Sequence, residues 1–279
     1  MKRALPIVMI QSPHPLNQPH WRDVLPDLER RLGADRILIS SDFDGTLSHI
    51  APTPEDAVIL PEIRVALDRL SRLPGVIVAV ISGRALANVE EKVGLPGITY
   101  GGNHGLEMQG PNMPPLKLFT EDVREDLDTA IAFLRSSLDH IPGVLIEDKG
   151  SSASVHYRQV APLYFDAVAA AVSDAAALSS QIQLRHGKMV WELRPDLGWN
   201  KGSAVIRLMA RFKIRAAAAF FLGDDETDND VFHVLPLGAT FVVGDHTTRE
   251  ASFRCYSPED AAGLLMWIAD QRERLPAVV

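Results

Sequence analysis

The stretch RILISSDFDGTL, residues 36–47, indicates the architecture of the chain. It opens with a compact apolar run, Arg36–Ser40, and two aspartates follow at alternate positions, Asp42 and Asp44. A run of this kind predicts a buried strand of a parallel sheet. Ligands of open α/β sheets bind at the carboxyl ends of the strands, so we expect both carboxylates at a binding edge.

The segments that follow alternate between helical and strand patterns. Apolar residues recur at helical spacing before Pro74-Gly75, and Val76–Ile81 is a nearly continuous β-branched run. Strand, helix and strand in this order form a βαβ unit, which indicates an α/β fold. The pattern returns late in the chain, with a predicted helix at Ser203–Phe212 and a predicted buried strand at Ala217–Leu222.

The middle of the chain has a different pattern, in which a helix and a hairpin each occur twice. Pro111–Pro115 predicts a hinge, and Ser152–Arg158 and Lys188–Arg194 alternate as half-solvated antiparallel strands do. We therefore predict an α+β insert within a discontinuous core. The predicted parts are a flexible leader at 1–20, the core at 21–108 and 197–279, and the insert at 109–196.

Composition excludes several classes of protein. Of the 279 residues, 46% are hydrophobic and 23% are charged, which is ordinary for a globular chain and excludes a disordered one. The net charge of −8 argues against a nucleic-acid binder, although it leaves room for a local basic pocket that holds an anion. The single cysteine, Cys255, excludes an intrachain disulfide and a multi-cysteine metal site, and we expect it to be buried.

Location is predicted from the apolar runs. No run approaches the ~18–20 residues that a membrane span needs. The first ten residues, Met1–Ile10, are interrupted by Pro6 and lack a small-residue cleavage site, so they do not match a signal peptide. We expect a cytoplasmic protein without a membrane partner.

The motif Asp42-Phe43-Asp44-Gly45-Thr46 carries the strongest chemical signal. Two carboxylates at i and i+2 share one side of an extended chain, so one can attack as a nucleophile while the other moves protons. Gly45 permits a tight turn, and the hydroxyl of Thr46 can donate to an oxyanion. The alternative is an aspartate-rich turn that caps a helix.

Three more motifs end predicted strands or open predicted helices. Ser82-Gly83-Arg84 offers a hydroxyl donor to a phosphate oxygen, although a plain helix cap is the simpler explanation. Asn200-Lys201-Gly202 places a lysine at a helix start, where a solvated surface charge is the usual outcome. Gly223–Asp228 holds four carboxylates within five residues, whose oxygen donors favour Mg²⁺ and whose spacing does not fit an EF-hand. A parallel sheet gathers these groups at one edge, where they form a constellation for phosphoryl transfer.

The chain resembles the haloacid dehalogenase (HAD) superfamily of phosphohydrolases and, within it, the trehalose-6-phosphate phosphatase family. The strings that carry the resemblance are DFDGTL at 42–47, ISGR at 81–84, YGGNHGLE at 100–107, EDKG at 147–150, HYR at 156–158, ELRP at 192–195, WNKG at 199–202 and GDDETDNDVF at 223–232. The resemblance implies a Rossmann-like parallel-sheet core with an inserted cap domain of the C2 type.

The resemblance also implies roles for the core residues. Asp42 is the nucleophile that becomes aspartyl phosphate, and Asp44 is the general acid and base. The phosphate-binding residues are Thr46, Ser82, Gly83 and Lys201. The implied cofactor is Mg²⁺, held by Asp42, the backbone carbonyl of Asp44 and Asp224, with Asp225 and Asp228 in support.

In the same way, the insert is implied to be a mobile cap that reads the sugar. The implied substrate-binding residues are Asn103, His104, Glu147, Lys149, Arg158 and Glu192. Independently of the resemblance, Glu147 and Lys149 share a strand face, and charged groups there suit a ligand covered with hydroxyls. The alternatives are ordinary surface ion pairs and, for His104, a histidine satisfied by the backbone.

The motifs predict a Mg²⁺-dependent phosphoryl-transfer site, and the resemblance implies a phosphatase that acts on trehalose 6-phosphate, with a functional link to the synthase that makes this substrate. Family members often carry Pro at the position of His49 and Glu at that of Asn229, which leaves the sugar open. The rivals are a phosphatase for sucrose 6-phosphate or glucosylglycerol phosphate, a phosphosugar mutase, and a sugar-phosphate-binding protein without catalysis.

Overall fold

The larger of two sheets carries the parallel strands that the sequence predicts. The computed structural model describes residues 18–275 except 188, 247 and 249. The strand order in this sheet is β12-β11-β10-β1-β2-β3-β4-β5, and every pairing from β12 to β3 is parallel. Its strands are β1 (Ile37–Ser41), β2 (Val76–Ile81), β3 (Thr99–Gly102), β4 (Glu107–Gly110), β5 (Met113–Lys117), β10 (Ala219–Gly223), β11 (Ala239–Val243) and β12 (Phe253–Cys255).

Helices cover both faces of this sheet, which explains why every residue of β1, β10 and β11 is buried. The helices are α1 (Leu25–Leu32), α2 (Pro61–Ser71), α3 (Leu86–Val93), α6 (Lys201–Phe212), α7 (Asn229–Val234) and α8 (Pro258–Arg274). The crossovers β1–α2–β2 and β10–α7–β11 run in opposite directions from the sheet centre. Right-handed crossovers therefore place α2 and α7 on opposite faces. α2 packs with α8, and α7 packs with α6.

The proline-rich segment predicted as a hinge belongs to the larger sheet instead. β4 and β5 form an antiparallel hairpin, and β4 pairs with β3. The predicted start of the insert, residue 109, therefore lies inside a strand of this sheet. Pro114 and Pro115 fit because β5 lies at the sheet edge, where a strand can lack N–H donors.

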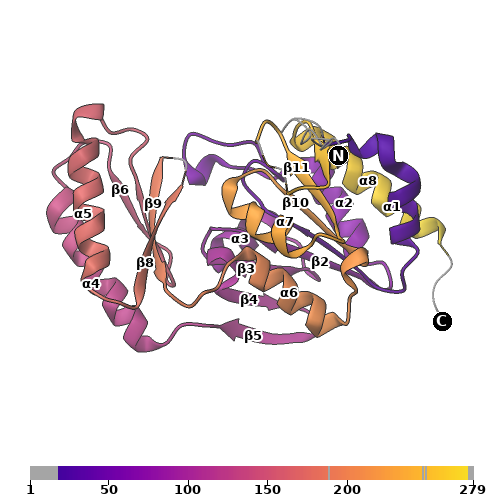
Figure 1. Ribbon diagram of the computed structural model, residues 1–279, viewed down its shortest axis with the longest axis horizontal. Helices are drawn as coiled ribbons and strands as arrows, with labels where there is room; N and C mark the ends of the chain where they lie inside the picture. The colour runs from indigo at the N-terminus through magenta and orange to yellow at the C-terminus, as the bar shows by residue number, and fades with distance from the viewer. Residues whose placement is uncertain (1–17, 188, 247, 249, 276–279) are drawn as a thin grey trace, which may run out of the picture.

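The insert, which we define as α4 to β9, is a separate α+β layer with its own apolar core. Its four strands are antiparallel in the order β6-β7-β9-β8. Figure 1 shows its sheet lying between its two helices and the larger sheet. The elements are α4 (Glu121–Leu138), β6 (Leu145–Asp148), β7 (Ala153–His156), α5 (Phe165–Ala177), β8 (Ile182–Gly187) and β9 (Val190–Pro195).

One face of the small sheet is apolar and the other is polar. Val155 and Leu193 are fully buried within the apolar core of the insert. Alternation along the strands places Glu147, Ser154 and Glu192 in one row on the opposite face, because Ser154 pairs with both glutamates. The polar face is thus free of the helices and available for the larger sheet and a ligand.

The structure bears on two expectations that came from the composition. Cys255 is fully buried in β12, as expected for a structural cysteine. Within the residues that the structure describes, no helix combines the length and apolar character needed to cross a bilayer. Of the predicted leader, residues 1–17 lie outside the described residues, whereas His20 pairs with Arg254 of β12.

Asp260, in the first turn of α8, binds three consecutive residues near the start of the described chain. It accepts hydrogen bonds from Trp21 Nε1 at 2.9 Å and from Arg22 Nη1 at 2.6 Å, and His20 Nε2 lies 2.5 Å from its other oxygen. Burial raises the pKa of Asp260, but His20 and the amide of Tyr256 outweigh it and bring the pKa to about 2. The ionised carboxylate therefore stabilises the folded state.

We expect Asp260→Asn to destabilise the protein by about 2 kcal/mol at pH 7, the scale of hydrogen bonds to a charged group. Folding depresses the pKa of Asp260 below its usual 3.8, so its contribution is complete above that pH and disappears as the pH falls through about 2. Thermal unfolding from pH 7 down to pH 3 measures the difference in unfolding free energy between variant and wild type. This difference should become smaller in acid. Glu259→Gln, on the exposed side of the same turn, is the control; an equal loss there would contradict the role of Asp260.

Candidate active site

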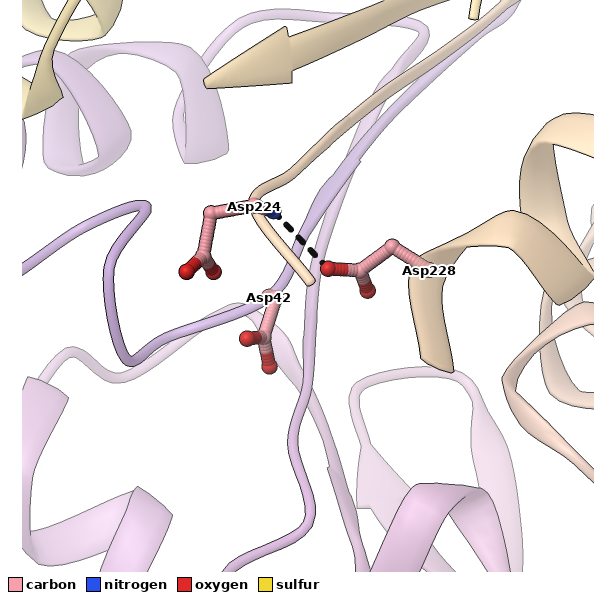
Figure 2. A group of neighbouring side chains, drawn as sticks. All are labelled: Asp42, Asp224 and Asp228. Atoms are coloured by element: carbon pink, nitrogen blue, oxygen red, sulfur yellow. Dashed lines mark hydrogen bonds between the residues drawn. The ribbon is translucent and has the colours of Figure 1, made fainter. Parts of the chain in front are cut away.

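Three aspartates from distant parts of the chain meet at one edge of the larger sheet. Asp42 follows β1, Asp224 follows the neighbouring strand β10, and Asp228 ends the short 3₁₀ turn Glu226–Asp228. One carboxylate oxygen of each lies within 4.8 Å of the others. Figure 2 shows the three side chains converging, with the backbone amide of Asp224 donating to Asp228 at 2.9 Å.

Lys201 joins this cluster from the first turn of α6. Asn200 caps that helix by accepting a hydrogen bond from the amide of Ser203, which places Lys201 at the helix start. The Lys201 ammonium lies 3.0 Å from Asp42 and 2.8 Å from Asp228, and the side chain is 1% exposed. The lysine is therefore a buried site residue, and the surface-charge alternative is wrong.

The electrostatics of the cluster follow from the burial of several like charges. Burial and the carboxylates of Asp228 and Asp225 raise the pKa of Asp224 to about 8. Burial raises the pKa of Asp228 to about 6, although Lys201 opposes the shift. Burial also raises the pKa of Asp42 well above its usual value. One ammonium does not balance these carboxylates, so the cluster favours an additional cation.

The donors around the cluster fit a divalent metal ion. Carboxylate oxygens are the ligands that hard divalent cations prefer. A side chain at Gly45 would place its Cβ 2.0 Å from the Asp224 carboxylate, and Gly45 has a φ of +79°. Only glycine therefore leaves Asp224 its place in the cluster.

Two of the predicted metal residues point their side chains elsewhere. Asp225 accepts hydrogen bonds from the Thr227 amide and hydroxyl, so it caps the 3₁₀ turn. Asp44 forms a bidentate ion pair with Arg84, with N–O distances of 2.7 and 2.6 Å. The prediction for Asp44 concerns its backbone carbonyl and is not affected by this pair.

Arg84 is a site residue to which the sequence analysis assigned no role. It is almost buried, and it also donates to Asn88 Oδ1 at 2.8 Å. Its position two residues after Ser82, directly beyond β2, was the available signal. Sequence spacing could not reveal the partner, because Asp44 lies 40 positions away.

The predicted phosphate-binding residues surround the same edge. Thr46 is buried and donates to Asp224 at 3.2 Å, so its hydroxyl supports the carboxylate cluster. Ser82 is buried at the end of β2, where its hydroxyl accepts from the amide of Arg84. A Cβ at Gly83 would lie 2.9 Å from the His104 ring, so residue 83 must be small.

A polar network joins the insert to this edge. Lys149 Nζ donates to the Gly83 carbonyl at 3.0 Å and lies 3.4 Å from Glu192. His104 Nε2 lies 3.1 Å from the other oxygen of Glu192. Burial raises the pKa of Glu192, but His104 and Lys149 outweigh it and hold the pKa well below its usual value. Burial lowers the pKa of His104. The network thus brings together three of the predicted sugar-binding residues, Glu192, Lys149 and His104.

The remaining predicted sugar-binding residues, Glu147, Arg158 and Asn103, lie in different surroundings. Glu147 lies on the polar face of β6, 2.9 Å from His156, whereas Lys149 lies just beyond that strand. Arg158 is exposed in the turn after β7, because the strand ends at His156 rather than at the predicted Arg158. Asn103 is fully buried beneath the insert.

Comparisons with known proteins identify the family of the chain. A family model described as trehalose-phosphatase matches residues 40–260. The trehalose-phosphate phosphatase of Mycobacterium avium is 38% identical over 277 residues, covering 90% of this chain and 68% of the relative. The chain belongs to the trehalose-phosphatase family. The enzyme of the same name from Mycobacterium bovis is 36% identical, with the same coverage of both chains.

Solved structures show the same HAD fold. The C-terminal domain of Candida albicans trehalose-6-phosphate phosphatase superposes with a TM-score of 0.76 at 24% identity, covering 91% of this chain and 98% of that one. A trehalose-6-phosphate phosphatase of Aspergillus fumigatus gives a TM-score of 0.63 at 25% identity, covering 91% and 99%. The Rossmann-like core with an α+β insert is therefore confirmed, and the family identifies the protein as a phosphoric monoester hydrolase that uses a divalent metal.

A divalent cation should raise the melting temperature of the protein, because it binds the folded carboxylate cluster and not the unfolded chain. At a hundredfold excess over Kd the gain is about 2.7 kcal/mol, which corresponds to a rise in Tm of roughly 5 °C for a chain of this size. Thermal unfolding with MgCl₂ and with EDTA measures it. Asp224→Asn should lose most of the shift and Asp230→Asn should keep it; equal shifts would contradict metal binding at this cluster.

Proposed function

We propose that this protein hydrolyses trehalose 6-phosphate to trehalose and phosphate, through an aspartyl phosphate on Asp42. The observation that carries the proposal is the convergence of Asp42, Lys201 and Asp224 at one sheet edge in a chain of the trehalose-phosphatase family. The curated relatives with that name support the substrate.

Asp42 is positioned to attack phosphorus. It directly follows β1, and its amide donates to the Leu222 carbonyl at 2.9 Å, which fixes the start of the loop. Lys201 lies 3.0 Å from one carboxylate oxygen and holds it in place while it balances the charge of the incoming phosphoryl group. The carboxylate forms a bond to phosphorus as the bond from phosphorus to the sugar oxygen breaks.

Asp44 supplies and removes the protons. It protonates the departing sugar oxygen, then takes a proton from the water that hydrolyses the aspartyl phosphate. In the structure both of its oxygens are bound to Arg84. Asp44 must therefore turn away from Arg84 to reach the sugar, and we propose that substrate binding provides this exchange of partners.

Mg²⁺ is the proposed metal, since its preference for oxygen donors matches the cluster. Asp42, Asp224 and the backbone carbonyl of Asp44 would hold it, with Asp225 and Asp228 in support. When bound, Mg²⁺ would neutralise charge on the phosphoryl oxygens. From the protein side, Ser82 and Lys201 would contact the same oxygens.

The insert acts as the cap that recognises the sugar. Its polar sheet face presents Glu147 and Glu192 toward the larger sheet, and Lys149 extends to the loop after β2. Charged groups of both signs suit a disaccharide covered with hydroxyls. Cytoplasmic location and a functional link to a trehalose-6-phosphate synthase stay predictions.

Asp42→Asn should abolish phosphate release, because an amide does not attack phosphorus, while the melting temperature stays within a few degrees of wild type. Phosphate release with Mg²⁺ should be measured on trehalose 6-phosphate, sucrose 6-phosphate and glucosylglycerol phosphate. Retained activity in the variant would contradict the covalent mechanism. Faster turnover of another sugar phosphate by the wild type would reassign the substrate, and slow release with phosphate transferred between positions would indicate a mutase.

Glu147→Ala should lower kcat/KM for trehalose 6-phosphate by roughly tenfold or more, the value of one or two hydrogen bonds to a charged group. Its effect on p-nitrophenyl phosphate, which has no sugar, should be within twofold. Glu125→Ala, at an exposed position of α4, is the control. Equal losses on both substrates would mean that the insert does not read the sugar.

A further inference from the structure

Asn103 begins a backbone turn that is held against the phosphate-binding loop. Asn103, His104 and Gly105 have φ values of +50°, +58° and +86°, a left-handed run that costs free energy at the two non-glycine residues. The amide of Asn103 donates to the Arg84 carbonyl at 2.7 Å, and that of His104 donates to the Ser82 carbonyl at 2.8 Å. These bonds fix the turn to the loop after β2.

The side chain of Asn103 is fully occupied by protein partners. Its amide nitrogen donates to the Lys149 carbonyl at 3.1 Å and to Glu107 at 3.2 Å. Its oxygen accepts from the Ser152 hydroxyl at 2.5 Å. Asn103 is 0% exposed. This arrangement leaves no donor for a sugar hydroxyl, unlike the substrate-orienting role that the resemblance implies.

Two of the partners of Asn103, Lys149 and Ser152, belong to one turn of the insert, residues 149–152. The turn is closed by the Lys149 amide, which donates to the Ser152 carbonyl at 2.9 Å. Ser151 adds a second attachment by donating to Glu107 at 3.0 Å. Ser151 and Ser152 are both buried, although they lie in a loop. The turn is thus docked on the larger sheet at Asn103 and at Glu107.

Docking of this turn decides where the Lys149 side chain lies. Its backbone carbonyl is held by Asn103, and its ammonium reaches the Gly83 carbonyl, next to Ser82. The backbone of Asn103 therefore binds the phosphate-binding loop, and the side chain of Asn103 binds the backbone of Lys149, a predicted sugar-binding residue. A loss of either connection would displace the ammonium relative to the phosphate.

We propose that Asn103 is a positioning residue that aligns the 149–152 turn with the phosphate-binding loop, so that Lys149 meets the sugar while Ser82 meets the phosphate. This role rests on the proposed function for its substrate, and it makes Asn103 a determinant of sugar specificity that does not touch the sugar. Lys149 exchanges the Gly83 carbonyl for a sugar hydroxyl when the substrate binds.

Asn103→Asp tests the proposal, because aspartate tolerates the left-handed backbone and keeps the size of the side chain. Its second oxygen would face the Lys149 carbonyl and the Glu107 carboxylate, which are acceptors. A misplacement of about 1 Å can cost a hundredfold in rate, so we expect kcat/KM for trehalose 6-phosphate to fall by about that factor. Activity on p-nitrophenyl phosphate should stay within twofold.

Ser152→Ala is the second variant, since it removes a partner of Asn103 and leaves the left-handed turn intact. It should lower kcat/KM for trehalose 6-phosphate and not for p-nitrophenyl phosphate. In the double variant, the decrease in kcat/KM caused by Ser152→Ala should not add to the decrease caused by Asn103→Asp. Ser136→Ala, an exposed hydroxyl in α4, is the control. If Asn103 touched the sugar directly, Ser152→Ala would have no effect; that result, or equal losses on both substrates, overturns the proposal.

Hydrogen exchange separates this proposal from the proposed function. Backbone amides of residues 149–152 should exchange at least tenfold faster in Asn103→Asp than in wild type, with unchanged exchange in α5. Unchanged exchange at 149–152 would overturn the docking role, whether or not the wild type cleaves trehalose 6-phosphate. A wild type that does not cleave this substrate would instead overturn the proposed function.

Discussion

The site depends on one buried ammonium. Lys201 lies between Asp42 and Asp228 with 1% of its side chain exposed, and its charge allows carboxylates from distant segments to share a small volume. Burial alone lowers the pKa of a lysine, but Asp228 and Asp42 raise that of Lys201 well above its usual value. Removal of the Lys201 ammonium would leave buried carboxylates without a counter-charge, which costs about 3–5 kcal/mol. Lys201 thus joins the start of α6 to the end of β1 and to the 3₁₀ turn that follows β10.

Two glycines allow the backbone to approach the aspartate carboxylates closely. A Cβ at Gly223 would lie 2.3 Å from the Asp228 carboxyl carbon, as a Cβ at Gly45 would meet Asp224. The carboxylates of Asp228 and Asp224 therefore fill the space that a Cβ at positions 223 and 45 would occupy. The geometry of the cluster is set as much by these two glycines as by the aspartates, and a parallel sheet supplies the adjacent strand ends that it needs.

The sequence predicted what depends on local pattern. The β-branched run Val76–Ile81 is β2 with the predicted bounds, and the motif aspartates lie where strand ends were expected. Contacts between distant segments escaped prediction. The Arg84–Asp44 pair, the docking of Asn103 and the pairing of β4 with β3 each depend on a partner that spacing does not reveal. The hinge prediction failed because prolines at a sheet edge leave the same sequence signal as prolines in a linker.

The free edge of β5 has a consequence for the behaviour of the protein at high concentration. An exposed edge strand invites a strand from another molecule, which begins aggregation. Pro114 and Pro115 have no N–H to donate, and they lie where the register between β4 and β5 shifts, so an added strand would not find a regular ladder along β5. At the opposite edge, the carbonyl of Pro19 already accepts from the amide of Arg254 in β12. Intermolecular growth of the eight-stranded sheet is therefore disfavoured at both ends.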